Sequence, residues 1–413
     1  MRRATGVLVA VALCAAREPA RAQEALLPST GWGTGLSLSA WHFATPLPQS
    51  AGGLGDVAEV AIPLSVRSML GRWSVDVSGA FVYGAAHYAA SPPSGAGPVP
   101  GPVASSSGGD RVVTVAGPTD VKLRVTGPLF GDALQFTAGL NLPTGKVGLT
   151  ANETSALQVI GSPALRMPIA ALGTGTGYTI GVLRSIAGDD WAVAIGASVE
   201  QRTEYSPIAL ALATGSAETH ITPGTAAHVT LGLDRVLGEG RLGALVVADV
   251  FSRDKVRQTV TGAADQVGDY TLGPQVTALT KLDFGAPGWR ESSVSLAVRQ
   301  RSAFTDSAGT KVAGSSGTYL EWAIGGVRGG AYGAGLIIAA DARWQSGMKF
   351  TDALVGAATT AVGVTLGVEQ AGQSTLTRFF VHGQYGSFDT GTAKSNGIGA
   401  TIGITVSSRR EAK

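Results

Sequence analysis

The sequence is poor in cysteine, in charged residues and in aromatic residues. The first two shortages limit the kinds of chemistry and the partners that the protein can have. Its single cysteine, Cys14, lies in an apolar run near the N-terminus, so the rest of the chain has no disulfide or thiolate chemistry. Charged residues make up 15% of the chain, against about 25% in ordinary soluble domains. The net charge of +2 predicts no strong attraction to nucleic acid or to anionic membrane surfaces.

Long apolar runs are also missing. The run at residues 6–16 is too short to cross a bilayer, and no later stretch reaches the roughly 18 apolar residues that a membrane helix needs. Two arginines precede this run, and Ala-Arg-Ala at residues 20–22 follows it, as in a secretory signal peptide. We therefore expect residues 1–22 to be a signal peptide and residues 23–413 to form the mature protein.

Strict alternation of apolar and polar residues is what the sequence does contain. Residues 73–83, 134–142 and 332–344 each carry apolar side chains at every second position, which predicts strands with two different faces. The first and third of these segments begin and end on aromatic residues. In a tilted strand these ends lie roughly 25–30 Å apart, which matches the apolar band of a transmembrane β-barrel.

Sixteen candidate strands follow from this pattern. They lie near residues 32–43, 54–67, 71–84, 111–126, 133–145, 176–187, 190–202, 224–237, 240–253, 268–283, 289–302, 316–328, 331–345, 361–370, 375–386 and 396–407. Short turns alternate with long connectors at residues 85–110, 146–175, 203–223, 254–267, 302–315 and 346–360. We predict an all-β fold: a transmembrane antiparallel β-barrel of the bacterial outer membrane, with about 16 strands, 14 or 12 being the alternatives, and both termini periplasmic.

Three tryptophans support this orientation. Trp73, Trp191 and Trp289 each follow a short turn, where an ascending strand would enter the periplasmic interface that indole rings favour. The long connector at residues 85–110 is rich in Pro, Gly and Ser and cannot bury a core. It is interpreted as a surface loop, and an inward fold that narrows the barrel is the alternative.

Catalytic motifs are not found. The five histidines form no HExxH pattern, and there is no G-x-S-x-G elbow. The nearest candidate is His220 with Glu218, which is more simply read as a solvated loop pair. We expect no catalytic, cofactor-binding or metal-binding residues, and a protein that is not an enzyme.

Ionisable residues occupy the strand face opposite to the apolar one. An Arg or Lys that faces lipid at the bilayer midplane costs roughly 2–4 kcal/mol, so these residues are expected to line the lumen. Their charges are of both signs, which predicts no strong ion selectivity, and pairing along the inner wall is an alternative role for each. The candidate lumen-lining residues are Asp76, Lys122, Arg124, Glu200, Asp249, Lys281, Arg299, Glu321, Asp341, Arg343, Arg378 and His382.

Residues 117–146, GPTDVKLRVTGPLFGDALQFTAGLNLPTGK, carry a family resemblance. The Gly-x-x-Asp-Val strand, the second alternating strand and the Leu-Pro-Thr-Gly that follows resemble a family of outer-membrane barrels assigned as transporters of the meta-pathway of phenol degradation. The resemblance implies passage of aromatic or other small hydrophobic compounds and brings no catalytic residues. We expect Thr144 and Gly145 to begin an extracellular loop and Lys146 to be a solvated charge.

The function expected from these observations is passive passage of small molecules through a polar lumen. A structural or surface-adhesion barrel without transport is the first alternative, and a barrel-embedded lipid or peptide hydrolase is the second. The expected partners are outer-membrane lipid, the barrel-insertion machinery and a small-molecule solute, with no nucleic acid and with homo-oligomerisation left open. The last predicted strand ends near Val406 without the terminal aromatic residue that usually serves insertion.

Overall fold

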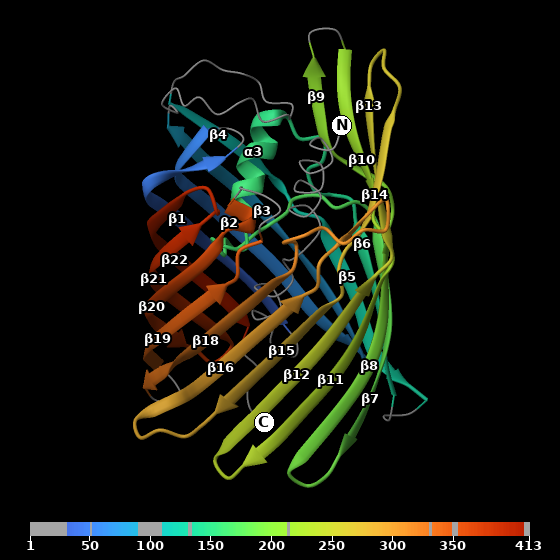
Figure 1. The fold of residues 1–413 in the computed structure, drawn as a ribbon. Helices are drawn as coiled ribbons and strands as arrows, with labels where there is room; N and C mark the ends of the chain where they lie inside the picture. The colour runs from blue at the N-terminus through green and yellow to red at the C-terminus, as the bar shows by residue number, and fades with distance from the viewer. Residues whose placement is uncertain are drawn as a thin grey trace.

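The computed structural model describes residues 31–49, 52–89, 110–130, 134–212, 215–329, 333–348 and 354–408. The predicted signal peptide at residues 1–22, most of the loop at 85–110, Tyr332 and the tail after Ser408 lie outside these residues. Nearly all of the described chain is β-strand, and Figure 1 shows the strands wrapped into one tilted barrel.

The barrel is a closed antiparallel sheet. Each strand pairs with the next one along the wall, and the last, β22, pairs with the first, β1, from Gly33↔Ser407 to Phe43↔Gly397. Its segments are β1 (Gly31–Gln49), β2 (Gly52–Leu70), β3 (Trp73–Ala89), β4 (Arg111–Pro118), β5 (Val121–Leu129), β6 (Leu134–Leu142), β7 (Gly177–Ala187), β8 (Trp191–Arg202), β11 (Ala226–Leu237), β12 (Gly240–Phe251), β15 (Gln275–Asp283), β16 (Trp289–Arg301), β18 (Gly317–Gly329), β19 (Gly333–Gln345), β20 (Ala358–Ala371), β21 (Thr375–Asp389) and β22 (Lys394–Ser408).

The predicted strand number is confirmed. Segments β4 and β5 both pair with β3, one above the other, so the 17 segments form a barrel of 16 strands. The interruption is a β-bulge at Thr119 and Asp120, because three steps along β3 from Ser78 to Phe81 face four steps from Pro118 to Lys122.

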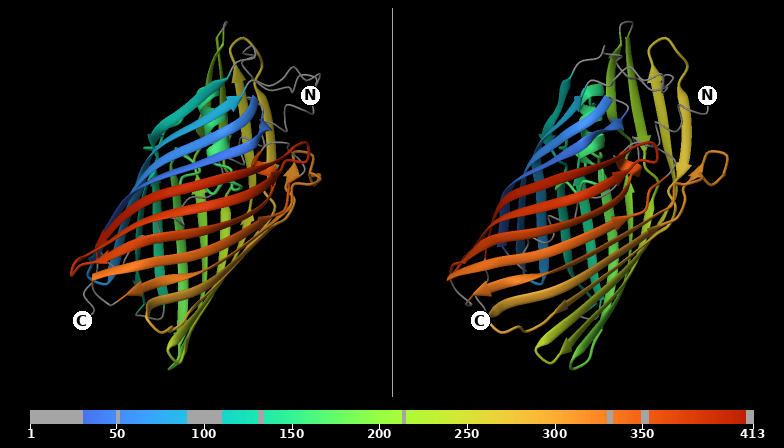
Figure 2. Two further views of the ribbon diagram at one scale, coloured as in Figure 1. Left: turned by 90° about the vertical axis from the view of Figure 1, so that its left-hand side faces the viewer. Right: turned by 60° about the vertical axis from the view of Figure 1, so that its left-hand side comes forward.

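A second sheet stands beyond the extracellular end of the barrel. It consists of β9 (Tyr205–Leu212), β10 (Gly215–Thr222), β13 (Arg253–Val260), β14 (Gln266–Thr271) and β17 (Thr305–Asp306). Its hairpins rise above the barrel wall on one side (Figure 2). The prediction of plain loops at 203–223, 254–267 and 302–315 was therefore wrong, and the predicted strand 268–283 is divided between β14 and β15. The sheet forms because its segments bury a small apolar core of their own, made of Tyr205, Ile221, Val256, Tyr270, Leu272 and Phe304.

The outer face of the barrel is apolar. On β20, Val362, Val364, Leu366 and Val368 all point outward and are about half exposed. The same alternation recurs on the other strands, so the wall presents hydrocarbon to its surroundings while its backbone groups are paired within the sheet. A closed barrel with this exterior is an outer-membrane barrel.

The short turns and the described chain ends share one end of the barrel. Gly31 pairs with Arg67, close to the turn after Leu70, and Ser408 pairs with Thr375 beside the turn before β21. This is the periplasmic end. Trp73, Trp191 and Trp289 begin β3, β8 and β16 there, as predicted.

Helix is rare among the described residues. The structure describes the α-helix α3 (Ala151–Ile160) and the 3-10 helix η1 (Leu354–Gly356), and neither is long and apolar enough to cross a membrane. The helix α3 differs from the long loop that the sequence predicts at residues 146–175. It begins with a capping box, in which the Thr150 side chain accepts from the Glu153 backbone N–H and the Glu153 carboxylate accepts from the Thr150 backbone N–H.

The positions of the outward-facing residues predict how much an introduced charge destabilises the barrel. Val364→Arg places a cation on the outer face in the middle of β20 and is expected to lower the free energy of unfolding in lipid by about 2–4 kcal/mol. Ile186→Arg is the control, because Ile186 is also exposed but stands at the periplasmic end of β7, where the cost falls to about 0–1 kcal/mol. Denaturant titration in phosphatidylcholine vesicles measures both. Equal costs at the two positions would contradict the assigned membrane depth.

Candidate functional site

Residues 143–176, called the inward segment below, occupy part of the barrel interior. After β6 ends at Leu142 the chain turns inward, forms α3 and returns to the wall at Gly177, where β7 begins. Figure 1 shows α3 inside the upper half of the barrel. The prediction that Thr144 and Gly145 begin an extracellular loop was therefore wrong. The described residues contain a narrowing segment at this place, and residues 90–109 of the predicted loop lie outside the described residues.

Asp120 joins the two ends of the inward segment. Its carboxylate accepts hydrogen bonds from the Gly145 backbone N–H at 2.8 Å, from the Thr174 backbone N–H at 2.6 Å and from the Thr174 hydroxyl at 2.9 Å. The amide of Asn141 donates a fourth bond, at 2.9 Å. Asp120 is almost fully buried, so these charge-assisted bonds replace the water that an exposed carboxylate would bind.

The bulge between β4 and β5 makes this contact available, and Gly145 allows the close approach. A Cβ atom at Gly145 would lie 2.5 Å from the Leu172 carbonyl oxygen and 2.7 Å from the Asp120 carboxylate. No other residue type fits there without movement of the backbone. We call these contacts of Asp120 with Gly145, Thr174 and Asn141 the Asp120 clamp.

The two ends of the 117–146 stretch meet at the clamp. The Thr144 hydroxyl accepts from the Val121 backbone N–H at 2.8 Å, and the Lys146 backbone N–H donates to the Pro118 carbonyl at 3.1 Å. The Lys146 ammonium pairs with Glu153 of α3, so it is not the solvated charge that was expected. The residues that carry the family resemblance therefore hold the inward segment in place.

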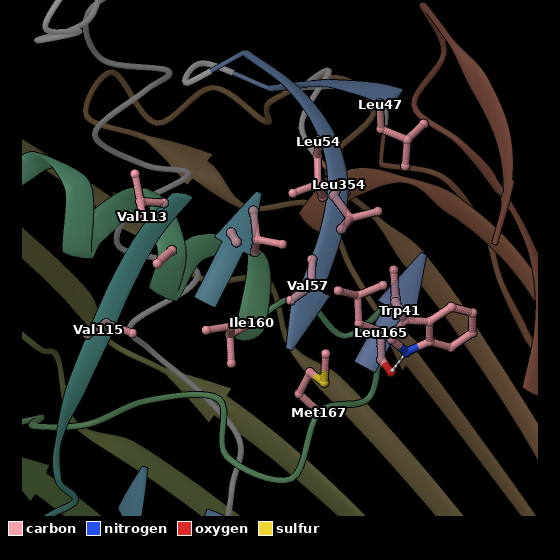
Figure 3. Packing of buried hydrophobic residues seen from close by; sticks show 14 of the residues in the cluster. Trp41, Leu47, Leu54, Val57, Val113, Val115, Ile160, Leu165, Met167 and Leu354 are labelled. Carbon is pink, nitrogen blue, oxygen red and sulfur yellow. Dashed lines mark hydrogen bonds between the residues drawn. The ribbon is translucent and has the colours of Figure 1, made fainter. Parts of the chain in front are cut away.

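Apolar packing fixes the middle of the inward segment against the inner wall. The Trp41 indole N–H donates to the Leu165 carbonyl at 3.1 Å (Figure 3), and the Ile169 backbone N–H donates to the buried Glu59 carboxylate at 3.0 Å. The cluster combines residues of the wall with residues of the segment. Among the residues labelled in Figure 3 are Trp41, Leu47, Leu54, Val57, Val113 and Val115 from the wall and Ile160, Leu165 and Met167 from the segment.

Charged side chains hold the far side of the segment. Arg166 forms an ion pair with Glu321 of β18, whose carboxylate also accepts from the Tyr319 hydroxyl at 2.5 Å. Arg343 of β19 donates to the Ala164 carbonyl at 3.0 Å and is almost fully buried. The segment thus contacts both sides of the barrel, and the free interior is reduced to the space beside it.

Among the described residues, two cavities lie beside the inward segment. The upper one has a volume of about 350 Å³ and lies between the segment and strands β5 to β16, with Ile169 and Leu172 on the segment side. The lower one has about 590 Å³ and is lined by Arg166 and by residues of β11, β12, β15, β16 and β18. They adjoin along two strands, because Val247 and Thr277 line the upper cavity while Leu245 and Leu279 line the lower one.

The twelve residues predicted to line the lumen all stand at strand positions of opposite parity to the exposed apolar side chains. Lys122, Arg124, Glu200 and Asp249 border the upper cavity, and Lys281 and Glu321 border the lower one. Many of the twelve side chains also contact another group of the protein through an ion pair, a hydrogen bond or an aromatic ring. These contacts are Asp76 with Arg67, Glu200 with Arg202 (2.6 Å), Asp249 with His228 (2.7 Å), Lys281 with Asp283 (2.7 Å), Arg299 with the Tyr319 ring, Asp341 with His382 (3.5 Å), Arg343 with the Ala164 carbonyl and Arg378 with Glu369.

Two groups of these residues therefore have different surroundings. Asp76 pairs with Arg67 and Arg378 pairs with Glu369, each near the periplasmic end of its strand. Arg343 supports the inward segment. The candidates beside the cavities are the ones in a position to meet a solute.

His220 and Glu218 lie in the extracellular sheet and not in a loop. The imidazole stands between Glu218 at 3.5 Å and Glu204 at 3.4 Å, and Arg257 pairs with Glu204 at 3.1 Å. These are surface contacts among β10, β13 and the residue that precedes β9. Within the described ranges no group of three or more His, Cys, Asp or Glu side chains is arranged to hold a metal ion.

The residues that fix the inward segment were missed in the sequence, although one signal was present. Trp41 and Phe43 stand at the parity opposite to the outward Leu36 and Leu38, where a polar lumen side chain was expected. Large apolar residues at inward positions require a covering element inside the barrel. Asp120 gave no such signal, because its partners are distant in the sequence.

Comparisons with known proteins find similar folds but no relative in sequence. No protein-family model matches the chain, and no curated protein matches it. A TodX mutant, described as a monoaromatic hydrocarbon channel, is 11% identical, with 94% of this chain and 92% of that chain covered and a TM-score of 0.46. DcaP, an outer-membrane channel of Acinetobacter baumannii, is 11% identical, with coverages of 91% and 96% and a TM-score of 0.39. OpdK of Pseudomonas aeruginosa, solved with vanillate, is 10% identical, with coverages of 91% and 98% and a TM-score of 0.37.

The Asp120 clamp can be tested directly. Asp120→Ala leaves the N–H groups of Gly145 and Thr174 without their acceptor and is expected to cost the docked segment at least about 3 kcal/mol. Trypsin should then cleave after Arg166 in the folded variant much faster than in the wild type. Asp389→Ala is the control, since Asp389 accepts from the Gly391 N–H in an extracellular turn away from the segment. Equal cleavage rates in the wild type and in Asp120→Ala would contradict the clamp.

The pair of Lys146 and Glu153 predicts a pH dependence. Burial raises the pKa of Glu153, but hydrogen bonds from Lys146 and Thr150 and the Lys146 charge outweigh it and hold the pKa below its ordinary value of 4.5. A carboxyl with a lowered folded-state pKa adds stability above the unfolded value and loses it as the pH falls through the folded value. The stability difference between the wild type and Glu153→Gln should be constant above pH 4.5 and shrink below it. Urea titrations from pH 7 to pH 3 measure this difference, and a gap that widens toward low pH would contradict the assignment.

Proposed function

We propose that the protein is a passive outer-membrane channel in which small molecules cross the barrel beside the inward segment. The observation that carries the proposal is that neighbouring inward residues of β12 and β15 line first the upper and then the lower cavity. The inward side chains of β12 run from Asp249 at the upper cavity through Val247 and Leu245 to Arg241 at the lower one. These positions would form one continuous wall of a passage from the extracellular to the periplasmic side.

The chemistry of this passage changes along its length. The upper part is bordered by charged side chains that include Lys122, Arg124 and Glu200, and the lower part by Asp234 and Lys281. Between them the wall carries Val247 beside the upper cavity, which Ile169 and Leu172 of the inward segment also line, and Leu245 and Leu279 beside the lower one, which supports an apolar waist. Such a passage favours small solutes with an apolar body and a polar group, because a strongly hydrated ion loses water at the waist.

The resemblance at residues 117–146 supports a solute of this class, since the family that it resembles is assigned to aromatic compounds. Mixed charge at both mouths supports weak ion selectivity. A surface-adhesion role is the second candidate, because the five-stranded sheet extends the protein beyond the barrel on the extracellular side. Conductance separates the two, since adhesion needs no open path.

Planar-bilayer recording tests the proposal. The wild-type protein is expected to give discrete conductance steps, and Val247→Trp should reduce each step at least about twofold, because the indole fills an already narrow waist. Val246→Trp is the matched control, since Val246 is the neighbouring residue and faces lipid. Absence of steps at any voltage would contradict the channel. Equal reductions from both substitutions would contradict the placement of the path along β12.

A further inference from the structure

Three ionisable side chains form a row on the outer face of the barrel, on the side of β1, β2 and β3. His42, Asp56 and His87 are direct cross-strand neighbours, and Asp56 pairs with both histidines. The His42 Nδ1 lies 2.6 Å from one oxygen of the carboxylate, and the His87 Nδ1 lies 3.0 Å from the other. The side chains of His42 and Asp56 are 69% and 49% exposed, so the row faces the surroundings of the barrel and not its interior.

A depression in the wall lies directly below this row, toward the membrane. One rung closer to the bilayer centre, the outward positions of four neighbouring strands are Ala400, Ala40, Ala58 and Ala85. Because these side chains are small, they leave a cavity of about 280 Å³ on the outer face, bordered by Val112 and Ile398 and topped by the ionisable row. This volume equals that of about nine water molecules in the liquid, at roughly 30 Å³ each, which is enough for part of an acyl chain.

The row stands at the upper edge of the apolar band. On β1 the outward side chains of Trp32, Leu36 and Leu38 are exposed and apolar, and His42 is the first ionisable one above them. At about 3.3 Å per residue and a tilt near 40°, the distance from Trp32 to His42 spans roughly 25 Å along the barrel axis. That is the height of the hydrocarbon layer that a barrel spans, so His42 and its neighbours lie where the headgroups of the outer leaflet begin.

We infer that this depression, together with the row above it, binds one anionic lipid of the outer leaflet. An acyl chain occupies the alanine-lined cavity, and a phosphate of the headgroup contacts His42 and His87. The carboxylate of Asp56 accepts from both Nδ1–H groups, which directs both Nε2 atoms away from it. Each Nε2 atom then faces the headgroup region, where a protonated ring offers an N–H donor to the phosphate.

Charge and shape both favour this occupant. With both rings protonated the row carries a net charge of +1, which complements a phosphate, while Asp56 keeps the rings oriented. The lining of the cavity is almost entirely apolar, and the cavity opens on the outer wall of the barrel. Acyl chains of the membrane surround this wall. A soluble solute has no reason to occupy a site in the hydrocarbon layer.

The experiment is delipidation followed by native mass spectrometry of the folded full chain in detergent, with diphosphorylated lipid A as the probe. Ala58→Phe fills the cavity without adding charge, and the double variant His42→Ala, His87→Ala removes the headgroup contact. Ala278→Phe is the matched control, an outward alanine of β15 that borders none of these cavities. Heat-modifiable migration on SDS gels establishes that each variant is folded.

The wild type and Ala278→Phe are expected to retain one lipid A per barrel, and both site variants should bind it about tenfold more weakly or worse, a loss of about 1.4 kcal/mol or more. Equal retention by the wild type and both site variants would overturn the inference. Equal binding of dephosphorylated lipid A would overturn the role of the histidines. Retention abolished by a chelator would indicate a metal site in place of the phosphate contact, and a lipid-independent dimer lost in Ala58→Phe would indicate a second copy of the chain.

Discussion

The interior of the barrel depends on one buried carboxylate. Asp120 sits at the bulge between β4 and β5 and accepts four hydrogen bonds, from Asn141, from Gly145 and twice from Thr174. Because its partners include both ends of the inward segment, this residue fixes the points at which the chain between β6 and β7 leaves the wall and returns to it. The bulge is a requirement of this arrangement, since it supplies the additional residue that a regular strand pairing would not provide.

The outer face of the barrel wall contacts lipid, and the inner face surrounds the lumen. The inward segment makes the two sides of the lumen different. Lipid requires an apolar outer face and a sheet without free edges, which the closed pairing of β22 with β1 provides. Inside, Trp41, Phe43 and Val57 pack against the segment on one side of the barrel, whereas the side of β12 and β15 keeps space lined by polar and small apolar groups. The asymmetry places both cavities along the wall formed by β12 and β15.

The barrel could be predicted from the sequence because lipid selects a side chain at every second residue. Stretches such as Leu134–Leu142 therefore show the strand and its faces locally. The inward segment could not be predicted in this way, because Thr144 and Gly145 read as an ordinary loop and their contact with Asp120 joins residues far apart in the chain. The inward-facing Trp41 was a usable signal that the interior is partly filled. The extracellular sheet was missed because each of its short strands is stabilised only by its neighbours.

Reagent accessibility along β12 tests the central claim, that solutes pass beside the inward segment. In a chain whose only cysteine, Cys14, is replaced by serine, single cysteines are introduced at Leu245, Val246 and Val247, and a charged water-soluble thiol reagent is added during single-channel recording. The account predicts that modification of Leu245→Cys and Val247→Cys lowers the conductance, while Val246→Cys, which faces lipid, is unaffected. Unchanged conductance at both inward positions would contradict it.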